Sequence, residues 1–312
     1  MKKPHILGAE ERFEWSSDSL EHSRSYMFKN HPEFVGLLHS SLQIKPGMQV
    51  VDVGCGTGFY TRLIAQALKG RGNVLGIDMN DELLKHARSL VKKSKLSGMV
   101  KFRKGDVYKL PLPDNYADLI FCNAVLWQLR DPDKPLQEMK RVVKPGGTVS
   151  ACEPDAETFM CYDPNDQHYC RLAKRALECF AKGVSKLQGY DFYMGRKLPT
   201  FFIRAGLEDV RMYPRYGASL ACDAKNVSFN EKLDHLRWMV RQLTDVSAEA
   251  RKRREWLKKM YLAGGMSETE FENYRKRNLE RMKLAIKYPE RINTDTSVVT
   301  WGAFIVVAKK PK

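Results

Sequence analysis

The sequence predicts an α/β protein with an open, mostly parallel sheet that carries helices on both faces. From about residue 45 to residue 153, short apolar runs alternate with amphipathic stretches of helical period, an alternation typical of parallel sheets. The apolar runs are continuous, as in strands that are buried on both faces. A glycine-rich turn also leads from the first predicted strand directly into the first predicted helix of this region.

The predicted elements follow in a regular order. Before the first strand, residues 21–43 have a helical pattern with apolar residues on one face. The core then reads as strand 49–53, helix 57–68, strand 74–77, helix 80–91, strands 99–103 and 118–122, helix 135–143 and strand 148–152. Beyond it we expect one helix within 154–193, a helix over 198–205, a strand near 210–213, helices over 230–243, 247–262 and from Ser267, and a strand over 298–308. Ser267 and Glu270 form a capping box.

The last strand determines the predicted domain division. Residues 298–308 are strongly strand-like and need a partner, which only the core sheet can supply. The expected division is therefore an N-terminal helical segment (1–44), a core (45–224 with 293–312) and a helical insertion (225–292). This insertion is rich in basic residues, and it is either a cap over the active site or a solvated helical face.

Composition limits the possible partners. The 312 residues include 53 Lys or Arg and 37 Asp or Glu, for a formal net charge of +16. This charge favours anionic partners such as nucleic acid or an acidic small molecule, although it also simply aids solubility. Seven cysteines without a CxxC pair argue against a disulfide framework and a zinc site. No apolar run reaches the length of a membrane helix, so we expect a cytoplasmic protein.

The turn after the first strand points to the ligand. It runs Asp52-Val53-Gly54-Cys55-Gly56-Thr57-Gly58, and glycines there let a ligand approach the backbone at a helix start. A dinucleotide turn has its third glycine one residue later, where this chain has Phe59. Pyrophosphate also avoids carboxylates, whereas Asp52 can hold an ammonium group. The pattern favours S-adenosylmethionine, whose methionine part carries such a group, over a dinucleotide.

Polar residues follow three further strands, where ligands of parallel sheets bind. Asp78 can accept both ribose hydroxyls, or it can cap the next helix, although Asn80 already suits that role. Asp106 and Val107 can bind an adenine edge, or they can form an ordinary turn. Asn123 and Ala124 follow the fourth strand.

These segments resemble one family. The stretches 51–58, 76–79, 105–107 with Leu110-Pro111, and LQEMKRVVKPGG over 136–147 are similar to class I, seven-stranded, Rossmann-like S-adenosylmethionine-dependent methyltransferases, in the branch of ubiquinone and menaquinone biosynthesis (methyltransferase type 11). The resemblance implies strand order 3-2-1-4-5-7-6 with an antiparallel last strand.

The resemblance also implies cofactor-binding roles. Gly54, Cys55 and Gly56 would line the methionine portion, and Asp78 would hold the ribose. Met79 would pack on the adenine, Asp106 and Val107 would bind its edge, and Asn123 would line the mouth at the methyl donor. The cofactor-binding set expected from the motifs and the resemblance together is Asp52, Gly54, Cys55, Gly56, Gly58, Asp78, Met79, Asp106, Val107, Asn123 and Ala124.

The expected activity is methyl transfer to an O, N, C or S nucleophile of a small molecule. Two alternatives are an RNA methyltransferase, suggested by the charge, and a non-catalytic S-adenosylmethionine-binding protein. Many relatives have His where this chain has Gln128, and no residue is a convincing base. Four residues near the expected mouth are as well explained by packing: Trp127, Gln128, Glu153 and Tyr193. No metal site is expected, and the methyl acceptor and oligomeric state stay open.

Overall fold

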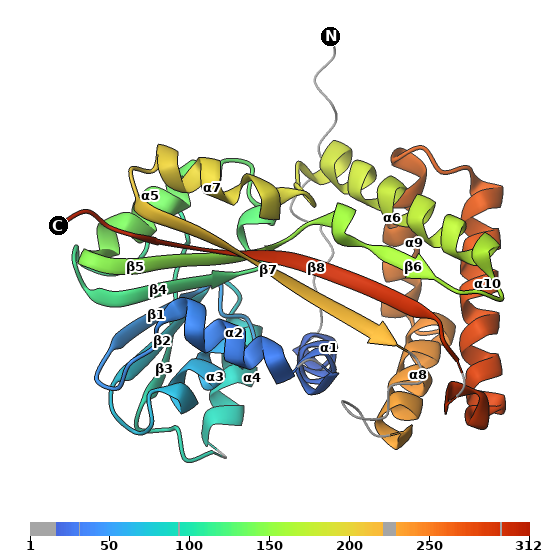
Figure 1. Cartoon of the computed structure of the whole chain (residues 1–312), viewed down its shortest axis with the longest axis horizontal. Coiled ribbons are helices and arrows are strands. Elements are labelled where there is room, and N and C mark those ends of the chain that lie inside the picture. Colours follow the sequence, from blue (N-terminus) through green and yellow to red (C-terminus); the bar gives the residue numbers. More distant parts are fainter. Residues whose placement is uncertain (1–16, 31, 93, 221–228, 294) are drawn as a thin grey trace, which may run out of the picture.

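The structure is a computed structural model that describes residues 17–30, 32–92, 94–220, 229–293 and 295–312 (Figure 1). Its centre is a twisted sheet in the order β3-β2-β1-β4-β5-β8, with β7 on the far side of β8. Parallel pairing joins β3, β2, β1, β4 and β5, and β8 runs antiparallel to its neighbours. The strands are β1 (Gln49–Val53), β2 (Asn73–Asp78), β3 (Val100–Lys104), β4 (Ala117–Asn123), β5 (Val143–Pro154), β6 (Met160–Tyr162), β7 (Glu208–Leu220) and β8 (Val298–Lys309).

The predicted order 3-2-1-4-5-7-6 is confirmed when β7 and β8 are counted as the sixth and seventh strands. The sequence analysis missed β6, an eighth strand of three residues. It pairs with the first part of β8, while β5 pairs with the second part. Strands β5 and β6 both pair with β8, because β5 pairs only with residues 303–309 of β8 and leaves residues 298–300 available on that side for β6.

Helices cover both faces of the sheet, with α5 and α7 on one and α2, α3 and α4 on the other (Figure 1). Each layer has its own apolar cluster. Val51 and Val53 pack towards α5 and α7, and Val50 packs towards α2 and α3, because successive strand residues point to opposite faces. These helices are α2 (Pro32–Leu42), α3 (Phe59–Ala67), α4 (Asp81–Lys92), α5 (Asp133–Val142) and α7 (Met194–Arg204).

A second helical layer lies beyond the carboxyl edge of the sheet. It contains α6 (Gln167–Gln188) and the three helices between β7 and β8 in the chain, which are α8 (Phe229–Thr244), α9 (Ala248–Ala263) and α10 (Glu268–Lys287). The predicted capping box of Ser267 and Glu270 is present. Helices α6 and α9 touch at two glycines. A Cβ at Gly183 would lie 1.8 Å from the Met260 carbonyl oxygen, and one at Gly264 would lie 1.7 Å from that of Cys179.

The described part of the chain also contains three short 3-10 helices, η2 (Leu126–Gln128), η3 (Ala156–Thr158) and η4 (Pro289–Asn293). Among the residues described, no helix is long and apolar enough to cross a membrane. The division of residues 225–292 as a separate helical insertion stays a prediction.

The N-terminal helix α1 (Ser17–Asn30) lies between the glycine turn and α8. On one side, the Thr57 hydroxyl donates a hydrogen bond of 2.8 Å to Glu21, which also pairs with Arg62 of α3. On the other side, His22 Nε2 lies 3.2 Å from His235 Nδ1, and its ring stacks on Trp238 at 4.3 Å. Helices α1 and α2 cover the helix expected over 21–43, and residues 1–16 lie outside the described residues. The division of 1–44 as a separate segment stays a prediction.

Replacing Gly183 with Ala should destabilise the protein. The new methyl group has no room beside Met260, so α6 and α9 must separate, and such overpacking costs about 1–3 kcal/mol. The control is Gly36→Ala, because Gly36 lies in α2 and a methyl group added there would meet no atom within 4 Å. This control should gain about 0.5–1 kcal/mol. Denaturant unfolding measures both changes, and equal stability of the two variants would contradict the close α6–α9 contact.

Acid should weaken the contact between α1 and α8. Burial lowers the pKa of His235 to about 4, and burial also lowers that of His22. Because both folded pKa values lie below the unfolded value, the stabilisation is complete above about pH 6.5 and is lost as the pH falls towards 4. His235→Phe should remove roughly 2 kcal/mol of this acid dependence, and His168→Phe, at an exposed site on α6, should not. Thermal unfolding from pH 8 to pH 4.5 tests this. Identical acid dependence in the wild type and His235→Phe would exclude this contact as the cause.

Candidate active site

The glycine turn follows β1 and lies beside the end of β2. Gly54, Gly56 and Gly58 have φ values of 69°, 54° and 71°, a left-handed region that glycine adopts without strain. A Cβ at Gly54 would lie 2.2 Å from Val125, and one at Gly58 would lie 2.6 Å from Phe102. Packing therefore demands these two glycines. At Gly56, the nearest atom to such a Cβ is Arg24 Nη1 at 3.3 Å, so the backbone there lies directly beside the guanidinium of α1.

Two carboxylates flank this turn. Asp52 is buried, and its Oδ2 accepts a hydrogen bond of 2.6 Å from the Thr61 hydroxyl. Burial raises its pKa to about 6, although Thr61 and the charge of Arg24 act in the opposite direction. Asp78 is half-buried and accepts from the backbone N–H of Gly56 at 2.8 Å and of Asn80 at 2.9 Å. Asp78 thus helps to shape the turn, which the sequence did not indicate.

Asn80 caps α4 as expected, since its side-chain oxygen accepts from the N–H groups of Glu82 and Leu83. Asp78 is therefore not needed for that cap. Beside it, Met79 is 73% exposed, an unusual state for a large apolar side chain. Its exposure suits a site that a flat apolar ligand covers.

The end of β3 is joined to the end of β2, because the Gly105 N–H donates to the Asp78 carbonyl at 3.0 Å. Asp106 is exposed at this edge, and one of its side-chain oxygens accepts from the Tyr108 N–H at 2.9 Å. Val107 lies beside it in the same turn. The turn predicted as an alternative role for Asp106 is present, and the second carboxylate oxygen is still able to accept another donor.

A strained turn follows β4. Ala124 has a φ of 55°, which is costly for any residue with a Cβ. The side chains of Trp127 and Gln128 both donate to its carbonyl oxygen, at 3.1 and 2.8 Å. The preceding Asn123 is 8% exposed, and its side-chain oxygen has no partner within the described residues.

Glu153, at the end of β5, holds the same turn. Its fully buried carboxylate accepts the backbone N–H groups of Val125, Leu126 and Trp127 at 3.1, 2.9 and 3.3 Å. Burial raises its pKa to about 8, and the three N–H donors counteract part of this rise. Trp127, Gln128 and Glu153, which were expected near the mouth of the site, therefore support the turn.

No pattern in the sequence indicated a role for Arg24 of α1. Its Nη1 is buried and has no hydrogen-bond partner among the residues described. The guanidinium lies 5.8 Å from the centre of the Tyr60 ring, and its charge lowers the pKa of Asp52 and of Cys55, whose burial has the larger and opposite effect. A long-range helix contact places Arg24 here, and no local pattern in the sequence marks it.

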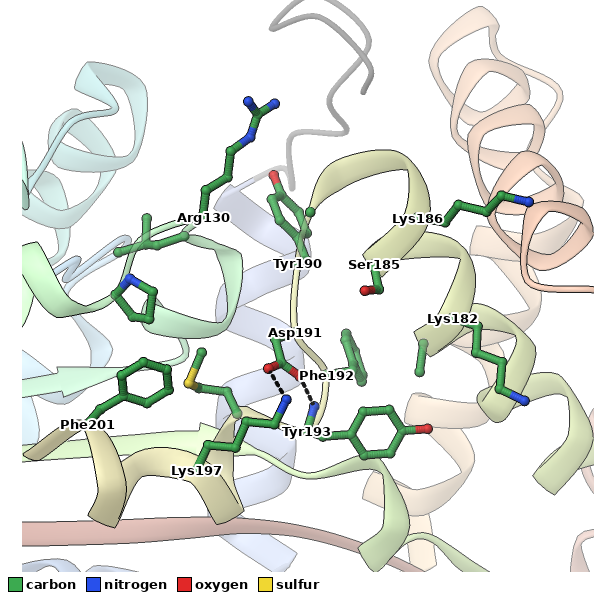
Figure 2. Close-up of a pocket in the computed structure, with 15 residues that line it drawn as sticks. Arg130, Lys182, Ser185, Lys186, Tyr190, Asp191, Phe192, Tyr193, Lys197 and Phe201 are labelled. Carbon is green, nitrogen blue, oxygen red and sulfur yellow. Dashed lines mark hydrogen bonds and ion pairs between the residues drawn. The ribbon is translucent and has the colours of Figure 1, made fainter. Parts of the chain in front are cut away.

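A cavity of about 540 Å³ lies beyond the β4 turn, between the C-terminal part of α6 and the start of α7 (Figure 2). Asp191 in its wall pairs with Lys197 at 2.6 Å and accepts the Tyr193 N–H at 3.0 Å. Three further cations line it without an acidic partner in the described part of the chain, namely Arg130, Lys182 and Lys186. The apolar part of its wall comes from Leu129, Tyr190, Phe192, Met194 and Phe201.

Trp127 connects this cavity to the β4 turn. Its ring meets Tyr190 and Phe192 edge to face, at 5.4 and 4.7 Å, and its carbonyl accepts the Asp191 N–H at 2.7 Å. Of the residues expected near the mouth, Tyr193 lines the cavity, whereas the side chains of Trp127 and Gln128 face Ala124. In the part of the chain that the structure describes, no group of three or more His, Cys, Asp or Glu side chains could hold a metal ion.

Known proteins resemble this chain in sequence and in fold. A demethylmenaquinone methyltransferase of Desulfitobacterium hafniense is 29% identical over 58% of this chain and 74% of that protein. An uncharacterised methyltransferase of Schizosaccharomyces pombe is 36% identical over 43% of this chain and 49% of that protein.

The fold also matches a phosphoethanolamine N-methyltransferase of Haemonchus contortus, solved with phosphomonomethylethanolamine and S-adenosylhomocysteine. The TM-score is 0.51 and the identity 17%, over 97% of this chain and 60% of that one. Residues 44–206 match the methyltransferase domain family. The chain belongs to this family, and it is an S-adenosylmethionine-dependent methyltransferase.

Proposed function

We propose that the enzyme transfers a methyl group to a small molecule with an apolar body and an anionic group. One observation carries the cofactor half of this proposal. Asp52 precedes the glycine turn and Arg24 lies against Gly56, near enough that its positive charge lowers the pKa of Asp52. The methionine part of S-adenosylmethionine has an ammonium and a carboxylate, and this pair of side chains complements both charges.

The buried groups fit the cofactor in two further respects. Arg24 Nη1 is a donor without a partner and Asn123 Oδ1 an acceptor without a partner in the described chain, and a buried polar atom left unpaired costs about 1–3 kcal/mol. A bound ligand that pairs with either atom recovers that energy. Gly56 lies directly beside the Arg24 guanidinium, so a ligand that pairs with Arg24 would also lie against the glycine turn.

The proposed roles extend along the edge of the sheet. Asp52 faces the ammonium, Arg24 the carboxylate and Asp78 the ribose hydroxyls. Met79 covers the adenine ring, and Asp106 and Val107 bind its edge. The residues that complete the proposed cofactor site are Gly54, Cys55, Gly56, Gly58, Asn123 and Ala124.

When bound, the cofactor supplies a methyl group on a sulfonium, which is a good leaving group. The protein then contributes mainly by orientation, and alignment of two reactants is worth about 7–11 kcal/mol. Glu153 fixes the β4 turn by three hydrogen bonds, so that Asn123 keeps its place at the mouth. Because Glu153, Trp127 and Gln128 are engaged in the turn, we propose that the acceptor presents a nucleophile that needs no base from this turn.

The acceptor half rests on the cavity of Figure 2. Its charged lining is Arg130, Lys182, Lys186, Lys197 and Asp191, and only Lys197 is paired with the acid. Three cations without an acidic partner in the described residues, set beside aromatic side chains, suit a molecule that is partly apolar and partly anionic. The relatives named for demethylmenaquinone support a small-molecule acceptor. We also propose a cytoplasmic location, as the cysteine pattern suggests.

Arg24→Met should weaken cofactor binding in a ligand-specific way. Loss of one charged hydrogen bond costs about 1.5–3 kcal/mol, or roughly ten- to a hundredfold in the Kd for S-adenosylhomocysteine. Methylthioadenosine lacks the amino-acid part, so its Kd should not change. Asp78→Asn is the matched comparison and should weaken both ligands, since both contain the ribose. Calorimetry gives the Kd values. If Arg24→Met weakens both ligands equally, Arg24 supports the fold and does not bind the carboxylate.

Charge reversal in the cavity should impair methyl transfer to the acceptor and leave cofactor binding unchanged. In Lys182→Glu with Lys186→Glu, we expect at least tenfold less transfer of label from S-adenosylmethionine to anionic metabolites of a cell extract, with an unchanged Kd for S-adenosylhomocysteine. Lys95→Glu with Lys283→Glu, both at exposed sites, changes the net charge by the same amount and should behave like the wild type. Label that enters RNA, or transfer that the double variant leaves intact, would contradict the proposed acceptor.

A further inference from the structure

We propose that Cys161 and Cys170 form a redox site that exchanges with a small anionic disulfide such as glutathione disulfide. Their Sγ atoms lie 2.8 Å apart. A disulfide bond is about 2.05 Å long, so a shift of under about 1 Å would join them. The pair lies on β6 and α6, beyond the cofactor site, and the proposal does not depend on the acceptor or on methyl transfer.

The backbone around both thiols is held in place. Cys161 lies in β6, where it pairs with Val299 of β8. Cys170 lies in the first turns of α6, which begins after the N-cap residue Asp166. Between them, the Asp163 side chain accepts the N–H groups of Asn165 and Asp166 at 2.9 and 3.2 Å. The two sulfurs therefore meet because of a short, hydrogen-bonded connection.

Helix α10 fastens this connection from outside. Arg281 pairs with Asp163 at 2.6 Å and with Asp166 at 3.1 Å, and Arg277 pairs with Asp166 at 2.7 Å. The ion pairs are partly shielded, because Asp163 and Asp166 have side-chain exposures of 6% and 14%. Preorganisation of this kind favours an intramolecular disulfide over two separate adducts, since little conformational freedom is left to lose.

A second cavity, of about 430 Å³, gives access to the pair. Both cysteines line it, together with Arg171 and Lys174, which are exposed, and with Asp163. Asp163 is already paired with Arg281, so the charge that the cavity offers a ligand is positive. Glutathione disulfide carries four carboxylates and two ammonium groups, and its net negative charge matches the two cations.

The proposed exchange proceeds in two steps. A cysteine thiolate attacks one sulfur of glutathione disulfide, forms a protein–glutathione disulfide and expels one glutathione thiolate, which takes up a proton. The second cysteine gives its proton to solvent and attacks the protein sulfur, which expels the second glutathione. Two protein thiols are thereby oxidised by two electrons, and one glutathione disulfide is reduced to two glutathione molecules.

The surroundings of Cys161 make this exchange slow near neutral pH. Burial, contact with the Cys170 thiol and the charge of Asp163 together raise the pKa of Cys161 to about 12, although the charge of Arg281 acts in the opposite direction. Since the thiolate is the reactive form, its low population limits the rate. The site therefore responds to a sustained change in the thiol–disulfide ratio.

The test uses the full-length protein in buffers of reduced and oxidised glutathione. After alkylation of free thiols, mass spectrometry of the peptides should show a Cys161–Cys170 link that is lost again with excess reduced glutathione. Cys161→Ser and Cys170→Ser should abolish the link and leave a glutathione adduct on the remaining cysteine. Cys222→Ser, which removes a different thiol, should still form it. Full alkylation of both cysteines at hundredfold excess of glutathione disulfide would overturn the proposal.

A second comparison tests the role of the cavity. Arg171→Glu with Lys174→Glu should slow oxidation by glutathione disulfide at least fivefold, and it should leave oxidation by uncharged hydroxyethyl disulfide unchanged. Equal slowing with both oxidants would exclude electrostatic recognition in the cavity. Equal rates in the variant and the wild type with both oxidants would exclude it as well.

Discussion

The parallel register of β1 with β2 and β4 is the constraint on which the site depends. Val53 pairs with Ile77 on one side and with Cys122 on the other. Gly54, which follows β1, and Asp78 and Asn123, which are the last residues of β2 and β4, are therefore brought to one edge. A shift of one residue would turn every side chain of a strand to the other face of the sheet. Buried apolar clusters on both faces resist such a shift.

The parts of the site that local sequence specified were predicted well. The run from Val50 through Gly58 combines a strand, a tight turn and a helix start within nine residues, so each part constrains the next. Asn80 as a helix cap and the capping box at Ser267 are local in the same way. The ligand roles expected for Asp52 and for the glycines of the turn stay predictions.

The missed features all depend on contacts between distant segments. Arg24 reaches the glycine turn only because α1 packs there, and Glu153 reaches the β4 turn only because β5 lies beside β4. In both cases an ordinary charged residue gains its role from the fold. The three-residue β6 was missed for a similar reason, since it has no apolar alternation and exists because β8 extends past β5.

The β4 turn shows how a strained backbone and a buried carboxyl group support each other. Left-handed backbone at Ala124 costs about 1–2 kcal/mol, and isolated burial of Glu153 would cost far more. Together they are tolerable, because the turn points three N–H groups at the carboxylate, and two side chains satisfy the Ala124 carbonyl.

Helix α1 connects two distant parts of the molecule. It contacts the glycine turn through Glu21 and α8 through His22, so its position depends on both. A ligand that binds Arg24 would hold α1 in place, and by linkage it would also favour the contact with α8. Helix α8, which lies within residues 225–292, is therefore connected to the glycine turn through α1. If residues 225–292 act as a cap, which is one of the two roles expected for them, this connection would give the cap a physical route to the cofactor site.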